Sequence, residues 1–322
     1  MPHSVASRQR PLHKIVLLMS AWLSVCSAPA PACKIIDAYS NRANTAATTS
    51  EASPEEELRA FQLKVSDRFP GLYAESVLGL RAGARQDSAV HVALAAARES
   101  HTSRQLAGRL RIEIDRATKM LAAFSDFHCD FPIYLADTLG QLDGAGRVVD
   151  GRHSLVLGVG NLDAEQSSIS LSTFIMHEMF HRYHYQAAGY SDDLADKQPI
   201  WQVTWVEGLA TYASQALTPG ATVGEALMLP ADLEQRAAPM LPSLVGDLLL
   251  HLDEVNTAVF TTYFTYGNQE VAHRGLPWRS GYYVGYLVAQ DLARHHSLNA
   301  LAHMKGRELH QQINDVLRQL AK

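Results

Sequence analysis

Cysteine is scarce in this sequence, and neither sign of charge dominates it. The 322 residues include three cysteines, 28 lysines and arginines, and 33 aspartates and glutamates, which gives a net charge of −5. So few cysteines exclude a small fold held together by several disulfides. The lack of a basic excess gives a nucleic-acid partner no electrostatic support. With 47% hydrophobic residues, the chain does have enough apolar material for a large buried core.

The apolar run near the N-terminus, residues 15–25, is too short to span a bilayer comfortably. It follows three basic residues and precedes small residues, which is the layout of a signal peptide. Ala30 and Ala32 form a cleavage pattern, so we expect residues 1–32 to be removed and the mature chain to be periplasmic or secreted, without stable membrane insertion. The alternatives are an uncleaved N-terminal anchor and a lipid-modified Cys33.

Two cysteines remain after the predicted signal peptide, Cys33 and Cys129. In an oxidising compartment they can form a disulfide, but two cysteines alone do not decide whether they pair. Residues 33–55 are polar and lack apolar periodicity, which predicts a flexible linker before the folded domain.

The remaining chain, residues 56–322, predicts one α+β domain that is mainly helical. Apolar residues recur at three- and four-residue spacing through most of residues 56–130, which indicates amphipathic helices. Two β-rich runs follow within residues 131–163, separated by a turn-forming segment, and they predict a small antiparallel sheet. Helical patterns then return and continue to the C-terminus, so the sheet precedes the helix around residue 177.

That helix carries the motif HExxH, formed by His177, Glu178 and His181. The two histidines are four residues apart, so both imidazoles project from one helix face and can converge on one metal ion. Glu178 is beside them, where its carboxylate can accept a proton from a water molecule activated by the metal. The flanking residues are largely apolar, which indicates a buried helix in which unpaired polar groups would be costly. The alternative is a pair of core histidines satisfied by neighbouring groups.

A catalytic zinc site needs a third protein ligand, and Glu207 is the candidate. It follows His181 by 26 residues and lies in the apolar helical segment QVTWVEGLATYAS. Two histidines and a glutamate are a known ligand set of catalytic zinc. The alternative role for Glu207 is a surface or salt-bridged carboxylate.

The metzincin pattern is excluded, because it requires a glycine three residues after the second histidine and a third histidine three residues later. His184 and Ala187 occupy those two positions. We interpret His184 as a packing residue or as a residue that supports the metal ligands.

A later segment, RSGYYVGY, supplies candidates for stabilising an oxyanion. Tyr282 and Tyr286 are four residues apart and share a helix face, and a phenol hydroxyl can hydrogen-bond a developing negative charge. Tyrosines at this spacing are also common in cores. Arg279 and His273 are weaker candidates for the same role.

These motifs resemble the gluzincins, the zinc metallopeptidases with a glutamate ligand, which share HExxH on one helix and a glutamate on a later helix. The segments IYLADTLG, SLVLGVGNLD and GLPWRSGYYVGYLVA further resemble a bacterial family of unknown function whose members are described as predicted zinc-dependent proteases. The resemblance covers about Pro132 to Leu292. It implies one zinc ion held by His177, His181 and Glu207, a zincin-like fold, and Glu178 as the general base.

The sequence therefore predicts an exported zinc metallopeptidase that cleaves peptide or protein substrates through a zinc-activated water, with residues 131–322 as the catalytic part. The alternatives are a non-catalytic, zinc-stabilised binding protein of the envelope and a zinc hydrolase of a non-peptide amide or ester. If the segment around residues 154–162 is an edge strand, an extended peptide could pair with it by strand addition.

Overall fold

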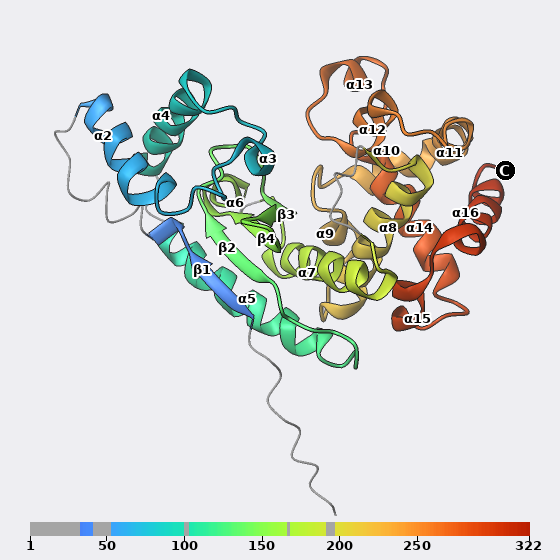
Figure 1. Cartoon of the computed structure of the whole chain (residues 1–322). Coiled ribbons are helices and arrows are strands. Elements are labelled where there is room, and N and C mark those ends of the chain that lie inside the picture. Colours follow the sequence, from blue (N-terminus) through green and yellow to red (C-terminus); the bar gives the residue numbers. More distant parts are fainter. Residues whose placement is uncertain (1–32, 41–52, 100–102, 166–167, 191–196) are drawn as a thin grey trace, which may run out of the picture. The chain divides into compact units, whose positions relative to one another are not determined.

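Four strands form one sheet in the computed structural model, which describes residues 33–40, 53–99, 103–165, 168–190 and 197–322. They are β1 (Lys34–Asp37), β2 (Pro132–Ala136), β3 (Gly144–Val149) and β4 (Arg152–Gly158), in the spatial order β1-β2-β4-β3 (Figure 1). β1 and β4 both pair with β2 in parallel, and only β3 and β4 are antiparallel.

The prediction of an antiparallel sheet is therefore wrong, since the sheet is mixed. The two β-rich runs of the sequence, β2 and β4, lie side by side and run in the same direction. They can do so because β3, in the segment that the sequence suggested was a turn, makes the antiparallel return and then occupies the edge of the sheet.

The predicted flexible linker, residues 33–55, is also corrected in part. Lys34–Asp37 form β1, and helix α2 (Pro54–Phe61) begins inside the predicted linker. Ser53 caps α2 through a reciprocal capping box with Glu56. The rest of the linker, residues 41–52, and the predicted signal peptide, residues 1–32, lie outside the described residues.

The sheet divides the buried apolar side chains into two clusters, because neighbouring residues of a strand face opposite sides. One set packs into a large cluster that we call the helical core, and its sheet members are Ile133, Leu135, Leu155 and Leu157. The other set packs into a small cluster that we call the cap core, and its sheet members are Tyr134, Ala136, Val149 and Val156.

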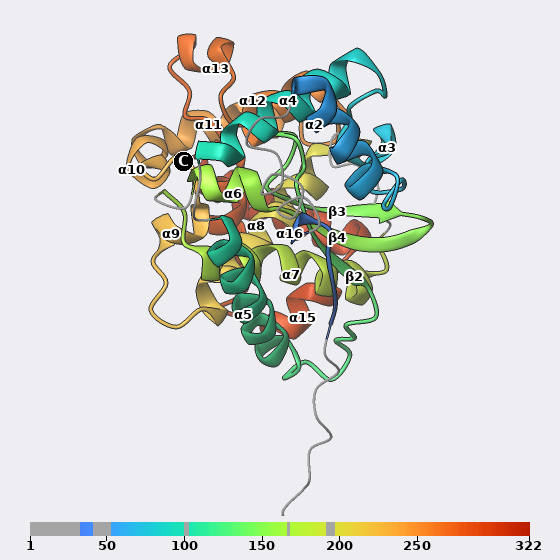
Figure 2. The same ribbon diagram turned by 90° about the vertical axis from the view of Figure 1, so that its left-hand side faces the viewer.

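The cap core covers its face of the sheet with helical elements from residues 54–99, seen beside the sheet in Figures 1 and 2. These are α2, the π-helical turn Gln62–Ser66, α3 (Glu75–Leu78) and α4 (Ala84–Glu99). The other helical elements come from the remainder of the described chain, and all of them except α13 contribute to the helical core or pack against it: α5 (Ser103–Leu121), α6 (Val159–Glu165), α7 (Leu171–Ala188), α8 (Ile200–Leu217), α9 (Val223–Leu227), α10 (Leu233–Ala237), the 3-10 turn Ala238–Met240, α11 (Leu241–Leu250), α12 (Thr257–Phe264), α13 (Gln269–His273), α14 (Ser280–Leu292), α15 (Leu298–His303) and α16 (Gly306–Leu320). The predicted α+β, mainly helical class is confirmed.

Helices α8 and α14 approach each other unusually closely. Gly208 of α8 and Gly285 of α14 meet at the crossing, and an added Cβ on either one would overlap the backbone of the other helix. Glycine is required on both sides because no larger residue leaves room for the two backbones. This crossing fixes α14 against the helix that carries Glu207.

A disulfide joins Cys33 to Cys129, whose Cα atoms are 5.1 Å apart across a sequence separation of 96 residues. It links the residue before β1 to the segment before β2, next to the parallel pairing of these two strands. The sequence left the pairing of these cysteines open, and the structure shows them bonded.

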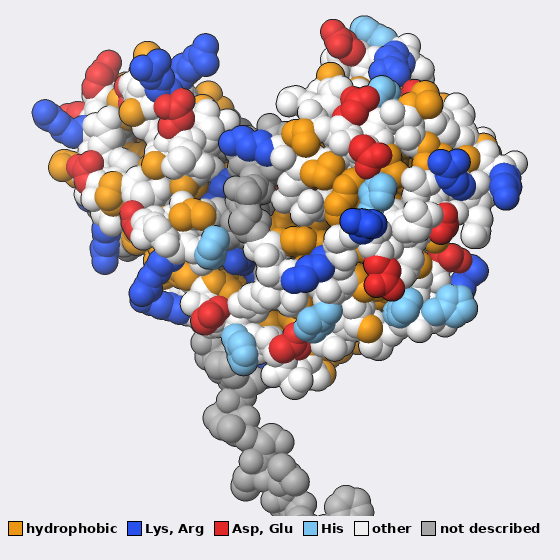
Figure 3. Space-filling model, turned by 45° about the vertical axis from the view of Figure 1, so that its right-hand side comes forward, with side chains coloured by type: hydrophobic (Ala, Val, Ile, Leu, Met, Phe, Trp, Pro, Cys, Tyr) orange, Lys and Arg blue, Asp and Glu red, His pale blue; other side chains and the backbone are white. Residues whose placement is uncertain are grey.

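On the face shown in Figure 3, basic and acidic side chains are interspersed, in keeping with the near balance of charge in the sequence. Within the described part of the chain, no helix has both the length and the apolar character needed to cross a membrane.

Candidate metal centre

His177, Glu178 and His181 lie on α7, which begins after Ser170 and ends at Gly189 in the left-handed conformation (φ 68°). The helix forms as the sequence predicts, since apolar residues flank the motif on most sides and are buried in the helical core. The four-residue spacing puts the two imidazoles on one face, and their Nε2 atoms are 2.9 Å apart. Both side chains are therefore aimed at one point.

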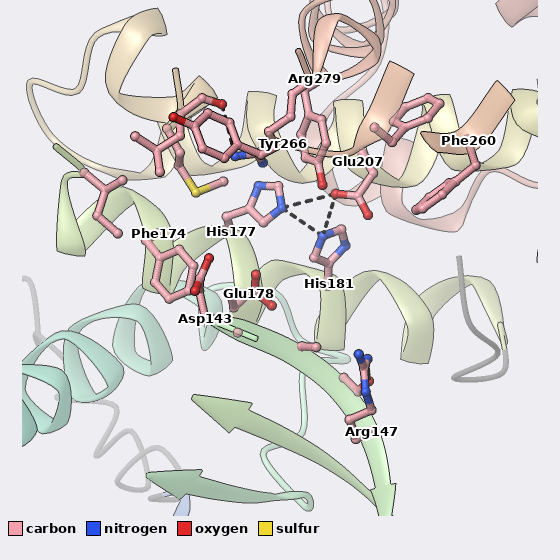
Figure 4. Close-up of a pocket in the computed structure, with 18 of the residues that line it drawn as sticks. Asp143, Arg147, Phe174, His177, Glu178, His181, Glu207, Phe260, Tyr266 and Arg279 are labelled. Atoms are coloured by element: carbon pink, nitrogen blue, oxygen red, sulfur yellow. Dashed lines mark hydrogen bonds and ion pairs between the residues drawn. The ribbon is translucent and has the colours of Figure 1, made fainter. Parts of the chain in front are cut away.

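Glu207 reaches the same point from α8. Its Oε2 lies 3.5 Å from Nε2 of His177 and 3.4 Å from Nε2 of His181, the contacts drawn as dashed lines in Figure 4. One donor atom from each of the three residues lies within 4.8 Å of the others, which is close enough to hold a metal ion. The structure thus brings together all three ligands predicted from the sequence.

The electrostatics of His177 and Glu207 suit metal ligands, whereas at His181 burial would lower the pKa but the carboxylate of Glu207 outweighs it and raises that pKa. Burial, with the neighbouring His181, lowers the pKa of His177 to about 4, so this imidazole is neutral near pH 7. Burial alone would raise the pKa of Glu207, but the two histidines outweigh it and hold that pKa well below its ordinary value. A neutral imidazole and an ionised carboxylate are the forms that bind a cation.

Glu178 lies beside this group without belonging to it. The residue is 8% exposed, and its side chain faces the start of β3, where a Cβ added to Gly144 would come 3.0 Å from the Cδ of Glu178. Burial raises the pKa of Glu178 to about 7, and the carboxylates of Glu207 and Asp143 add to the rise while His181 opposes it. Glu178 is therefore a carboxyl group that can exchange a proton near neutral pH.

A cavity of about 550 Å³ opens in front of these residues. One wall is the edge of the sheet, formed by Asp143 and by residues 144–147 of β3. The opposite wall comes from the helical region and is apolar and aromatic, with Met228, Leu229, Phe260, Phe264, Tyr266 and Tyr282. A cavity of this size, with one apolar wall and several converging polar groups, is large enough to bind a ligand.

The two candidate tyrosines have different surroundings. Tyr282 lines the cavity, with its ring centroid 6.2 Å from that of His177. Burial, and then the charge of Glu207, raise the pKa of Tyr282 above its ordinary value, so its hydroxyl remains a hydrogen-bond donor. Tyr286 does not line the cavity, and its hydroxyl donates to Oε1 of Gln215 at 2.9 Å. The structure thus places Tyr286 away from the cavity, one turn further along α14 and beside α8.

The two weaker candidates for stabilising an oxyanion also differ in their position relative to the cavity. Arg279 lines the cavity, whereas His273 is exposed on α13 and does not. His184 is fully buried, and its ring packs near Phe180 and Trp205, in agreement with a packing role.

Sequence reasoning missed two residues of the sheet wall, Asp143 and Arg147. Asp143 accepts a hydrogen bond from Asn161, and Arg147 donates to the carbonyl oxygens of Val77 and Gly146. Their segment looked like a turn because of its glycines, and a polar residue on each side of GAG was the signal that could have found them.

Comparison with known proteins adds no family assignment, since no family model, curated protein or solved structure matches the chain. The geometry alone defines the class of site: a His-His-Glu group that can bind a metal ion, at the side of a cavity.

Proposed function

We propose that this protein is a zinc-dependent hydrolase, a metallopeptidase in which His177, His181 and Glu207 hold one zinc ion and Glu178 is the general base. The observation that carries the proposal is the convergence of three metal-binding side chains next to an additional buried carboxylate in a cavity.

Zinc is the metal that this donor set fits best. Two imidazole nitrogens and one carboxylate oxygen are ligands of catalytic zinc sites, which keep the fourth position open. Structural zinc sites instead close with four ligands and favour cysteine. The two cysteines of the described residues are bonded to each other, and neither of them lines the cavity. This difference argues against the alternative of a zinc-stabilised binding protein.

When bound, zinc supplies a Lewis acid that polarises a carbonyl group and makes water more acidic. Glu178 accepts the proton of the attacking water and returns it to the leaving amine. Tyr282, a neutral phenol beside His177, donates a hydrogen bond to the carbonyl oxygen as negative charge develops on it.

The substrate is an extended peptide, and β3 is the strand that receives it. The sequence hypothesis of strand addition at residues 154–162 is wrong, because β4 lies between β2 and β3 and residues 159–162 are helical. β3 is an edge strand, and residues 144–147 of it line the cavity. Gly144, Ala145 and Gly146 have almost no side chain, so a peptide backbone can approach this edge and add a strand.

Export remains part of the proposal, and the disulfide supports it. Disulfides persist in oxidising compartments such as the periplasm or the outside of the cell. The bond between Cys33 and Cys129 therefore fits a chain that folds after export.

The test is metal-dependent hydrolysis by the purified mature chain. We expect about one zinc ion per chain, cleavage of unfolded proteins, loss of cleavage after chelation, and recovery on addition of zinc. The variant His177→Ala/His181→Ala should neither bind zinc nor cleave. A protein that binds zinc but cleaves none of a panel of peptides, amides and esters would support the alternative of a zinc-stabilised binding protein. A protein that cleaves only the non-peptide amides or esters would support the alternative of a non-peptide zinc hydrolase.

A further inference from the structure

Arg279 has a backbone conformation that its residue type disfavours. It precedes α14 with φ 58° and ψ 22°, in the left-handed region where a residue with a Cβ costs about 1 kcal/mol relative to glycine. Glycine would adopt this conformation freely, so the arginine side chain must contribute something that offsets the cost. Of the four non-glycine residues with positive φ in the described chain, Met228 and Arg279 both line the cavity.

The guanidinium of Arg279 is held in a fixed place. Its Cζ lies 3.9 Å from the centre of the Tyr282 ring, and Nη1 donates to the carbonyl oxygen of Leu229 at 3.3 Å. A cation over an aromatic face is attracted by the ring, and stacking also sets the plane of the guanidinium. Since the Tyr282 ring also neighbours the ring of His177, the cation lies one aromatic ring away from the metal ligands.

This cation has no carboxylate partner among the residues that the structure describes. Elsewhere on the surface, Arg111 pairs with Asp37 and Arg294 with Asp291. Within the cavity, the carboxylate of Glu207 faces the two histidines. In Figure 4, Asp143 and Glu178 are beside the strand, on the other side of the histidines from Arg279.

The surroundings of Arg279 make an unpaired cation costly and a new ion pair favourable. Phe264, Tyr266 and Leu229 line the same wall, and charges attract each other more strongly beside apolar groups than in water. A guanidinium offers five N–H groups in a planar fork that matches the two oxygens of a carboxylate. The hydrogen bond to Leu229 uses one of them.

We propose that Arg279 binds a carboxylate of the substrate, so that the site selects peptides with a negative charge next to the cleaved bond. The inference rests on the proposed function and names its substrate class. The carboxylate has two sources, the C-terminus of a short peptide or the side chain of an aspartate or glutamate. The first makes the enzyme cut near chain ends, and the second makes it cut beside acidic residues.

Peptide binding tests this without turnover when it is measured on the zinc-loaded Glu178→Gln protein. The probes are one unstructured peptide with a free C-terminus and an internal glutamate, its C-terminal amide, and its Glu→Gln analogue. A hydrogen-bonded ion pair predicts that one of the two changes weakens binding about 10- to 100-fold. Loss with the amide identifies the terminal carboxylate, and loss with the glutamine analogue identifies the side chain.

Arg279→Gln on the same background should bind all three peptides with the weakened affinity, and Arg279→Lys should recover part of the difference. Arg274→Gln, an exposed arginine outside the cavity, is the matched control and should behave as its parent. Equal affinity for all three peptides in the parent, or an Arg279→Gln effect of the same size on charged and neutral peptides, would overturn the inference. Zinc content and wild-type cleavage, measured in parallel, report separately on the proposed function.

Discussion

The helical core and the cap core lie on opposite faces of one sheet, yet they differ in the polar groups they bury. Elements of the helical core bury His177, Glu178, Arg182 and His184, all on α7. The helices of the cap core bury a single charged residue, Glu57, at the limit of burial with 9% exposure. Burying ionisable groups costs stability unless a partner compensates, so their concentration on α7 indicates function rather than folding. The cap core buries fewer ionisable groups, although Asp137, which directly follows β2 and whose carbonyl oxygen accepts a hydrogen bond from Tyr73 of the cap core, is also buried.

If the helical core is the functional side of the sheet, zinc binding must depend on its residues. We expect His177→Ala/His181→Ala to abolish zinc binding, because it removes both nitrogen donors of the three-residue group. His273→Ala, on the exposed face of α13, is the control and should keep zinc. Equilibrium dialysis with zinc measures both, and full retention by the double variant would show that the ion lies elsewhere.

Truncation in the cap core should cost stability and leave the metal site intact. Phe61 is 2% exposed and packs edge-on against Tyr73, with ring centroids 5.5 Å apart. Phe61→Ala should lower the free energy of unfolding by about 3 to 5 kcal/mol through lost burial and a cavity. Denaturant unfolding measures the loss, and the folded fraction should still bind zinc with unchanged affinity. A weaker zinc affinity in that fraction would mean that the two cores are coupled.

The crossing of α8 and α14 should be the most sensitive backbone position of the helical core. Gly208→Ala adds a methyl group where the backbone of Gly285 lies, so we expect a loss of about 1 to 3 kcal/mol. Gly246→Ala is the matched control, because Gly246 is inside α11 with open space around it and alanine is the better helix former. Thermal unfolding should show a lower Tm for the first and an equal or higher Tm for the second.

The smallest effect is expected for the ion pair between Arg111 and Asp37, which are 2.7 Å apart near the edge of the sheet. Burial opposes ionisation of Asp37, but hydrogen bonds from Ser40 and the charge of Arg111 hold its pKa below the ordinary value. The pair therefore stabilises the fold above the ordinary aspartate pKa, and the contribution disappears as the pH falls through the lowered pKa. Arg111→Gln should cost less than about 1 kcal/mol at pH 7 and nothing in strong acid. A cost that grows toward low pH would contradict this assignment.

The sequence predicted the three residues of the candidate metal group because two of them depend on local spacing and the third lies in a second apolar helix. His177 and His181 share a face of any helix, and the apolar flanks of Glu207 already indicated a second buried helix. The sheet was harder, since pairing is decided between distant segments. The glycines of residues 144–146 looked like a turn, and β1 was hidden in a polar stretch.

Tyr282 and Tyr286 show within one helix that spacing along the sequence does not reveal how a side chain packs. Tyr282 and Tyr286 share a face of α14, so spacing alone treats them alike. The packed structure separates them, since Tyr282 lines the cavity whereas Tyr286 hydrogen-bonds Gln215 of α8.

The central claim is that Glu178 acts on a proton while its three neighbours hold the metal. The most direct measurement is the hydrolysis rate and the zinc content of Glu178→Gln, determined on the same preparation. Glutamine keeps the size of the side chain but cannot accept a proton, so we predict one zinc ion per chain and a rate lowered by about a hundredfold or more. Glu207→Gln, measured alongside, should instead weaken zinc binding. A Glu178→Gln protein that holds zinc and cleaves as fast as wild type would contradict the account.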